Sequence, residues 1–150
     1  MSKFRRVMCF LLSVVAFACL LPLPGAAQEI ALASEAAVLM DAESGQILYG
    51  KNMDSTMYPA SITKVLTGLL ALKYAKETDK VTMTQAGVSQ VPRTSSHIAL
   101  EPGEAFTMKD ALYALALVSA NDAAVAIAET VCGSVEAFAK LMNEEAEKLG

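Results

Sequence analysis

A serine and a lysine stand three residues apart at the start of a long apolar segment, YPASITKVLTGLLALKYAK, which contains Ser61 and Lys64. In a helix, residues i and i+3 share a face, so the hydroxyl of Ser61 and the amine of Lys64 can touch. A serine hydroxyl becomes an effective nucleophile when an adjacent base removes its proton. An amine is such a base only in its neutral form, and an ordinary lysine, with a pKa of about 10.4, is almost entirely charged at neutral pH. The apolar neighbours of Lys64 predict the burial that would favour the neutral form.

The same pair has a purely structural explanation. With ordinary usage of serine and lysine, one S-x-x-K in a chain of this size is about what chance supplies. Ser61 could be a helix cap, and Lys64 could extend its amine from a helix face into water. The two residues alone leave catalysis and structure open.

A second polar group, Ser119-Ala120-Asn121, interrupts the apolar region ALYALALVSANDAAVAIAETVC. Polar side chains between two buried helices must find partners. In one interpretation, Ser119 or Asn121 caps the helix that begins near Asp122. In the other, the turn directs Ser119 toward Lys64 as a proton relay and Asn121 toward an amide of a substrate. S-x-x-K combined with a second serine motif is the pattern of β-lactamases and penicillin-binding proteins.

Two longer stretches make a resemblance specific: AAVLMDAESGQILYGKNMDSTMYPASITKVLTGLLAL and LEPGEAFTMKDALYALALVSANDAAVAIAE. In sequence and order they resemble the serine D-alanyl-D-alanine carboxypeptidases, low-molecular-mass penicillin-binding proteins of the peptidase S11 type. The resemblance covers almost all of residues 28–150. It implies a mixed α/β (α+β) fold of the β-lactamase/transpeptidase type, an antiparallel sheet flanked by helices. Residues 28–150 would be the N-terminal part of that catalytic domain.

The resemblance also implies a role for each motif residue. Ser61 would be the acylated nucleophile, and its backbone N–H would supply half of an oxyanion hole. Lys64 would be the general base, Ser119 the proton relay to the leaving amine, and Asn121 a hydrogen-bond donor to the substrate. The implied reaction removes the terminal D-alanine from peptidoglycan pentapeptide stems, and β-lactam antibiotics would acylate the same serine. No cofactor or metal is expected, and a single histidine, His97, excludes a multi-histidine metal site.

The family's third motif, Lys-Thr-Gly, does not occur in the 150 residues. We therefore expect the chain to be the first part of a longer protein and to be inactive on its own. Three alternatives to the carboxypeptidase stay open: a class A β-lactamase, a non-catalytic penicillin- or peptidoglycan-binding protein, and a DD-endopeptidase. Against the β-lactamase stands Ala120, where that family usually has aspartate.

The first 27 residues have the three parts of a secretory signal peptide: a basic start, an apolar run of 15 residues and small residues up to Ala27. An uncleaved anchor and a lipoprotein site at Cys19 are the alternatives. Cleavage would remove three of the 12 basic residues and none of the 16 acidic ones, leaving a net charge of −7 and Cys132 as the one cysteine. Such a charge excludes a general attraction to nucleic acid. We expect export to the periplasmic or cell-wall side, with membrane anchoring through a C-terminal segment left open.

The remaining pattern predicts the elements that position these motifs. Residues 36–52 predict a β-hairpin with Ser44 and Gly45 in its turn, and residues 80–85 a short strand. Residues 86–106 predict an irregular segment with one short extended piece. The helix after Pro59 is expected to be mostly buried through a broad apolar face, made of Ile62, Val65, Leu66, Leu69, Leu70 and Leu72. Thr107 with Asp110 predicts a capping box, Gly133 a helix end and Ser134 a helix start. On the last helix, a solvated face is expected at Glu144, Glu145 and Glu147.

Overall fold

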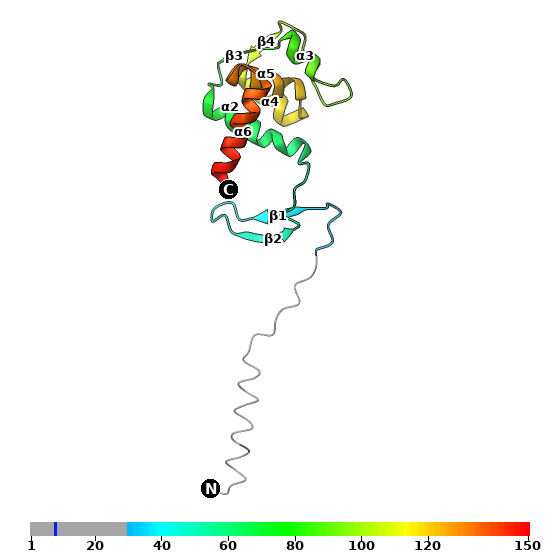
Figure 1. The fold of residues 1–150 in the computed structure, drawn as a ribbon, viewed down its shortest axis with the longest axis vertical. Helices are drawn as coiled ribbons and strands as arrows, with labels where there is room; N and C mark the ends of the chain where they lie inside the picture. Colours follow the sequence, from blue (N-terminus) through cyan, green and yellow to red (C-terminus); the bar gives the residue numbers. More distant parts are fainter. Residues whose placement is uncertain (1–7, 9–29) are drawn as a thin grey trace. The chain divides into compact units, whose positions relative to one another are not determined.

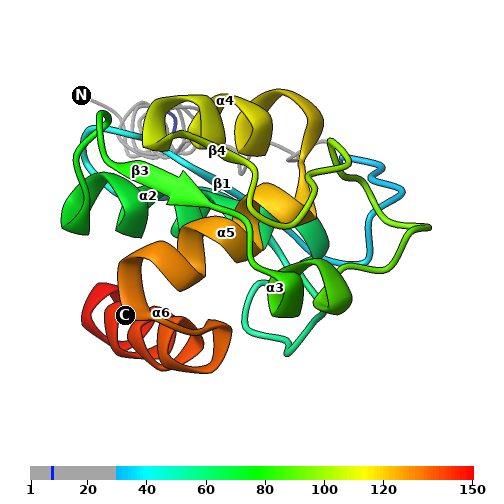
Figure 2. The ribbon, with the colours of Figure 1, turned by 90° about the horizontal axis from the view of Figure 1, so that it is seen from above.

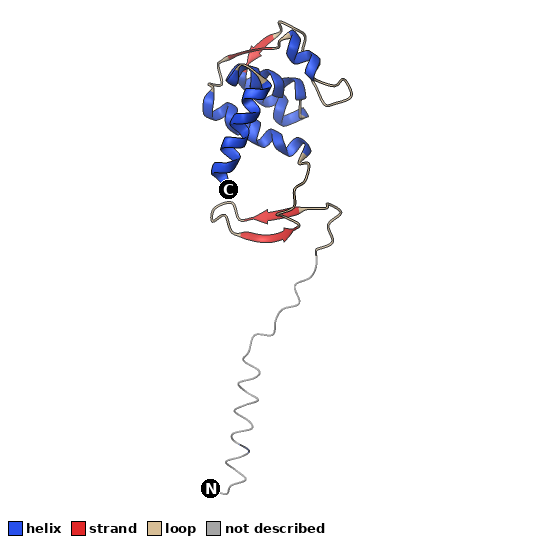
Figure 3. Cartoon of the chain, viewed as in Figure 1, coloured by secondary structure: helices blue, strands red, loops and turns tan. Residues whose placement is uncertain are grey.

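The fold is seen in a computed structural model, which describes Met8 and residues 30–150. The predicted signal peptide lies outside these described residues apart from Met8, so it stays a prediction. The chain divides into two units, one ending at Thr56 and the other running from Met57 to Gly150. Figure 1 shows the elements in sequence order, and Figure 3 separates helices from strands. None of the helices in the described part of the chain combines the length and apolar character needed to span a membrane.

The first unit contains the predicted hairpin. Strands β1 (Ala37–Met40) and β2 (Ile47–Lys51) pair antiparallel. The Asp41 carboxylate accepts hydrogen bonds from the backbone N–H of Ser44 at 2.8 Å and from its hydroxyl at 2.6 Å. These bonds lower the pKa of Asp41. Gly45 has a φ of +71°, a left-handed conformation that glycine adopts without strain, so the turn forms where it was predicted.

The second unit is mostly helical. Its strands β3 (Lys80–Thr82) and β4 (Ala105–Thr107) pair antiparallel with Val81 opposite Phe106, which confirms the strand predicted in residues 80–85. Helices and small antiparallel sheets together confirm the mixed α/β class. The helical elements are η1 (Ala60–Ile62), α2 (Thr63–Tyr74), α3 (Gln85–Gln90), α4 (Met108–Val118), α5 (Asn121–Cys132) and α6 (Val135–Leu149).

Helix α5 forms the centre of this second unit. It contacts α2, α3, α4 and α6, and Figure 2 shows it between α4 and α6. The side chains of Ala123, Ala126 and Ile127 are completely buried. Because alanine side chains are small, neighbouring helices can approach the α5 backbone closely. Helix α5 is thus packed on several sides, and Asn121 is its first residue.

Capping residues end and begin the helices where the sequence predicts. Thr107 accepts a hydrogen bond from the Asp110 N–H while the Asp110 carboxylate accepts from the Thr107 N–H, a complete capping box. Gly133 ends α5 with a φ of +80°. Ser134 accepts from the Ala137 N–H at 3.1 Å and begins α6. Local hydrogen bonds thus set these boundaries.

The prediction of an irregular segment over residues 86–106 is wrong at its start, where α3 forms. Thr84 precedes this helix and accepts a hydrogen bond from the Gly87 N–H at 2.8 Å. The Thr84 hydroxyl also donates to Glu129 of α5, with distances of 3.0 and 2.9 Å to the two carboxylate oxygens. A helix of six residues is too short to show a helical period in its sequence, so only these tertiary contacts reveal it.

The prediction that α2 is mostly buried is also wrong for the described residues. Leu70 is fully buried and Leu66 packs against the core, as expected. Val65, however, is 74% exposed, and the other exposed members of the predicted face are Ile62, Leu69 and Leu72. The cause is geometric, since α4, α5 and α6 are the helices of the described residues that pack on α2, and they leave this side of it uncovered.

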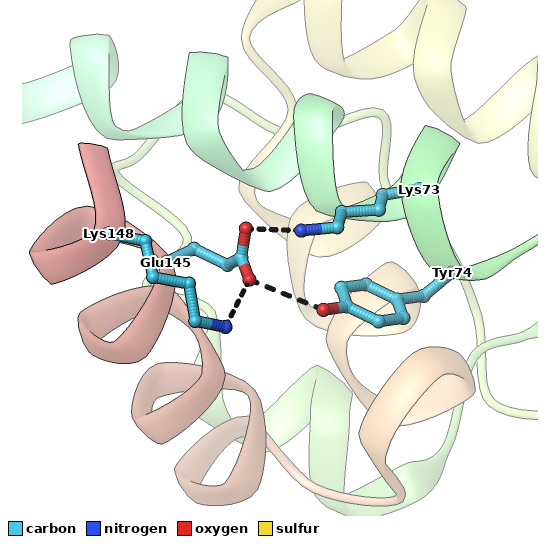
Figure 4. A network of polar contacts seen from close by, with 4 residues as sticks. All are labelled: Lys73, Tyr74, Glu145 and Lys148. Carbon is cyan, nitrogen blue, oxygen red and sulfur yellow. Dashed lines mark hydrogen bonds and ion pairs between the residues drawn. The ribbon is translucent and has the colours of Figure 1, made fainter.

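The predicted solvated face of α6 is corrected at Glu145, which is only 5% exposed. Its carboxylate forms ion pairs with Lys73 of α2 at 2.5 Å and with Lys148 at 2.7 Å, and it accepts a hydrogen bond from the Tyr74 hydroxyl at 3.4 Å (Figure 4). The hydrogen bonds from Lys148 and Lys73 lower the pKa of Glu145 to about 2. Glu145 therefore joins the last helix to α2 through charge-assisted hydrogen bonds.

Candidate active site

Ser61 lies in the short helical turn η1, directly before α2. The Ile62 N–H donates to the Pro59 carbonyl at 3.1 Å, which closes this turn. Ala60 has a φ of +49°, a left-handed conformation that costs a residue with a Cβ about 1–2 kcal/mol. Strain of this kind persists where the surrounding structure imposes it, and it is frequent next to functional residues. The Ser61 side chain is exposed.

Lys64 lies in the first turn of α2 and is half-buried, so the burial predicted from its apolar neighbours is only partial. Its Nζ donates a hydrogen bond to the Ser61 Oγ at 3.2 Å. The two side chains thus meet as the spacing of three residues predicts. An explanation in which Lys64 simply extends into water does not account for this contact.

Ser119 lies at the end of α4, in a left-handed conformation with a φ of +56°. Its Oγ donates a hydrogen bond to the Ser61 Oγ at 2.9 Å. From the sequence we expect Ser119 to point toward Lys64. In the structure its hydrogen-bond partner is Ser61 instead. The Ser61 oxygen consequently receives hydrogen bonds from an amine on one side and a hydroxyl on the other.

Asn121 is the first residue of α5, and the residue at the helix cap is Ala120, with no side-chain cap bond. The interpretation in which Ser119 or Asn121 caps this helix is therefore wrong. The Asn121 N–H donates to the Ser96 carbonyl at 2.8 Å, and the residue lines a cavity of about 420 Å³ together with Ser95. Asn121 is half-buried at the junction between α5 and the preceding loop.

A second cavity, of about 460 Å³, is lined by Arg93, His97, Leu100 and Asp122 among others. Neither Ser61, Lys64 nor Ser119 lines either of these two cavities. At the serine site, Ser61 is exposed, whereas Lys64 and Ser119 are half-buried. No cluster of three or more metal-ligating side chains occurs among the described residues.

Chemically, the arrangement suits attack by the Ser61 oxygen on an acyl group. Lys64 is within reach of the hydroxyl proton, since the Nζ–Oγ distance of 3.2 Å is close to hydrogen-bond length. Ser61 also precedes a helix, where free backbone N–H groups and the positive end of the helix dipole favour developing negative charge. Such a site can run covalent acyl transfer without a metal.

Asp122 is a buried residue whose contacts the sequence analysis missed. Only 3% of it is exposed, and backbone N–H groups of the preceding loop donate to its carboxylate. The sequence does contain one sign of a buried carboxylate here, because Asp122 lies at the start of an alanine-rich helix. Because an acidic residue in the first helical turn also suits the helix dipole, that signal has an ordinary explanation too.

The chain resembles known proteins both in sequence and in fold. The family model of the D-alanyl-D-alanine carboxypeptidases, Peptidase S11, matches residues 24–150. D-alanyl-D-alanine carboxypeptidase DacF of Bacillus subtilis is 41% identical over 127 residues, which cover 81% of this chain and 32% of that protein. DacC of Escherichia coli is 40% identical over 121 residues, 75% of this chain and 30% of that protein. The solved structure of penicillin binding protein 6B from Escherichia coli has a TM-score of 0.73 at 32% identity, over 85% of this chain and 43% of that one.

The fold is therefore that of the penicillin-binding transpeptidase class, with a serine and a lysine placed at the start of α2. Within that class, the chain belongs to the peptidase S11 family of D-alanyl-D-alanine carboxypeptidases. It spans about a third of the length of the curated relatives described here.

Proposed function

We propose that the protein containing this chain is a serine D-alanyl-D-alanine carboxypeptidase that removes the terminal D-alanine from peptidoglycan pentapeptide stems. The observation that carries the proposal is the convergence of Lys64 and Ser119 on the Ser61 oxygen in a member of this family. The proposal includes export across the bacterial cytoplasmic membrane, because the substrate lies outside the cytoplasm.

The reaction begins at Ser61. Lys64 acts as the general base and accepts the hydroxyl proton as Ser61 Oγ attacks the carbonyl carbon between the two D-alanines, and the carbonyl electrons move onto the carbonyl oxygen. The Ser61 N–H stabilises this oxyanion as one of two donors, the second lying outside these residues in the family pattern. The C–N bond then breaks, and a proton passes through Ser119 to the leaving amine of D-alanine. Water hydrolyses the resulting Ser61 ester.

Asn121 is assigned to binding the substrate through its side-chain amide. Its place at the start of α5 supports this role, since the turn that carries Asn121 also carries Ser119. A side chain on a rigid helix holds a substrate amide more closely than one on a loop. The same contact would orient the amide of a β-lactam, whose ring mimics the D-alanyl-D-alanine bond.

The test uses the protein produced from its complete reading frame, since these 150 residues lack the Lys-Thr-Gly motif. Purified protein is incubated with a pentapeptide stem ending in D-Ala-D-Ala, and released D-alanine is measured. The proposal expects release by the wild type and none by Ser61→Ala. Cleavage of cross-linked dimers instead would indicate an endopeptidase, while absence of any cleavage would favour a binding protein.

A further inference from the structure

Asp122 is a buried carboxylate bound by backbone N–H groups from two parts of the chain. The Ile98 N–H donates to its two oxygens at 3.2 and 3.1 Å, and the Leu100 N–H donates to Oδ2 at 3.0 Å. The Ala123 N–H, on its own helix, donates to Oδ1 at 2.9 Å. A carboxylate that is nearly removed from water holds its place only when donors of this kind surround it.

The loop that supplies two of these donors is shaped around the carboxylate. Ala99, between Ile98 and Leu100, has a φ of +60°. Its N–H donates to the imidazole Nδ1 of His97 at 3.0 Å. Alternation of conformations of this kind can turn neighbouring N–H groups toward one anion. The loop therefore forms a concave set of donors, and Asp122 fills it.

This loop is also bound to the turn that carries the second serine. The Asn121 N–H donates to the Ser96 carbonyl at 2.8 Å. On the other side, the Ala120 N–H donates to the Ala114 carbonyl of α4 at 3.2 Å, and Ala120 is fully buried. The turn from Ser119 to Asn121 is thus held between α4 and the loop. Asp122, the next residue, supplies the bonds that keep the loop in place.

We propose that Asp122 is a positioning residue for acyl transfer, acting by holding the loop of residues 96–100 against the turn that presents Ser119 and Asn121. The inference rests on the proposed function of Ser61. Asp122 does not touch the reacting atoms. Its effect reaches them through two contacts, from Asn121 to Ser96 and from Ser119 to Ser61.

In the primary test, Asp122→Asn replaces one carboxylate oxygen, which accepts hydrogen bonds, with an NH2 group. The new amide N–H group then faces backbone N–H donors, and the loop should detach. We measure acylation by benzylpenicillin under single-turnover conditions, which separates the binding constant from the rate of the acylation step. Because small displacements of catalytic groups cost up to about 100-fold, the acylation step should slow by roughly 10- to 100-fold, with a smaller change in binding. Proteolytic cleavage after Arg93, an exposed residue next to this loop, should accelerate.

A matched control separates positioning from general destabilisation. Ile127 lies on the same helix, five residues after Asp122, and is fully buried. It is truncated to Val or Ala to match the thermal midpoint of Asp122→Asn. This control should keep the wild-type acylation rate and resist cleavage after Arg93. Equal loss of acylation in the control would assign Asp122 a merely structural role and overturn the inference.

A second pair of variants leaves Asp122 in place, in case Asp122→Asn does not fold. Ala99→Val puts a β-branched residue at a positive φ and should loosen the loop, whereas Ala99→Gly suits that conformation. We expect slower acylation and faster cleavage after Arg93 only in the valine variant. Wild-type acylation in both Ala99→Val and any folded Asp122→Asn would overturn this inference alone. Failure of the wild type itself to be acylated would overturn the proposed function together with it.

Discussion

The hydroxyl of Ser119 donates a hydrogen bond to the hydroxyl oxygen of Ser61 at 2.9 Å, across 58 residues of sequence. Lys64 donates to the same oxygen from within its own helix, at 3.2 Å. Two helix boundaries therefore meet at one oxygen atom, the start of α2 and the end of α4. This convergence connects the local motif to the tertiary fold, since neither serine could reach the other without the packing of α2 against α4.

Removing the amine should abolish most of the acylation. Lys64→Ala deletes the group that accepts the Ser61 proton, and a general base contributes about 10²- to 10⁴-fold to rate. We expect the second-order rate constant for acylation by benzylpenicillin to fall by roughly that factor, measured with a fluorescent penicillin. Lys76→Ala, at an exposed lysine just after α2, is the control and should acylate normally. An unchanged rate in Lys64→Ala would remove the lysine from the mechanism.

Removing the second hydroxyl should mainly slow release of D-alanine. Ser119→Ala deletes the proposed relay to the leaving amine, and we expect a loss of roughly 10²-fold in turnover of a pentapeptide. Ser89→Ala is a suitable control, because the Ser89 hydroxyl only donates to the Gln85 carbonyl in α3. Wild-type turnover in Ser119→Ala would show that another group carries the proton.

A cavity in the central helix should destabilise the fold. Ile127 of α5 has no exposed surface, and truncating a buried isoleucine to alanine lowers the free energy of unfolding by about 2–5 kcal/mol. Chemical denaturation of Ile127→Ala measures this loss. Lys140→Ala, at an exposed position of α6, should change the free energy of unfolding by less than about 0.5 kcal/mol. If Ile127→Ala lowered the free energy of unfolding no more than Lys140→Ala does, the central packing of α5 would be contradicted.

Glu145 should make stability depend on pH in the acid range. Its pKa is lowered from 4.5 to about 2 by Lys148 and Lys73, so the folded state binds its proton less readily than the unfolded state. The stabilisation is therefore complete above the unfolded pKa and is lost as the pH falls from about 5 toward 2. Thermal midpoints of wild type and Glu145→Gln across this range should converge at low pH.

Glu144 provides the matched control for this pH effect, because it is an exposed neighbour on the same helix. Glu144→Gln should keep the wild-type slope of thermal midpoint against pH. If Glu145→Gln showed the same slope as wild type, the ion pairs with Lys73 and Lys148 would not contribute to stability in solution.

Local features of the fold could be predicted from sequence because their causes are local. Ser44 and Gly45 determine the hairpin turn, Thr107 and Asp110 form the capping box, and Gly133 ends α5. In each case the cause lies within four residues. Either a side chain forms a hydrogen bond with nearby backbone, or a glycine adopts a positive φ without strain. The S-x-x-K contact belongs to this group, since its two side chains share one helical turn.

Features that depend on distant contacts were beyond sequence reasoning. Glu145 has the composition of a solvated face. Its partner Lys148 is local, but the packing of α6 against α2 is needed to bring Lys73, 72 residues earlier, to the buried carboxylate. From its position in the first turn of α5, Asp122 would be expected only to interact with the helix dipole. In the structure it also accepts hydrogen bonds from a loop more than 20 residues earlier. The exposed side of α2 was misjudged because apolar periodicity indicates a face without indicating what covers it.

The proposed function requires that Ser61 form a covalent acyl-enzyme. To test this, the intact mass of the protein from its complete reading frame is followed during incubation with excess benzylpenicillin. We expect a lasting one-to-one adduct that maps to Ser61 and is absent in Ser61→Ala. Rapid return to the free mass with consumption of penicillin would indicate a β-lactamase. An adduct that survives in Ser61→Ala, or no adduct in the wild type, would contradict the assignment of Ser61 as nucleophile.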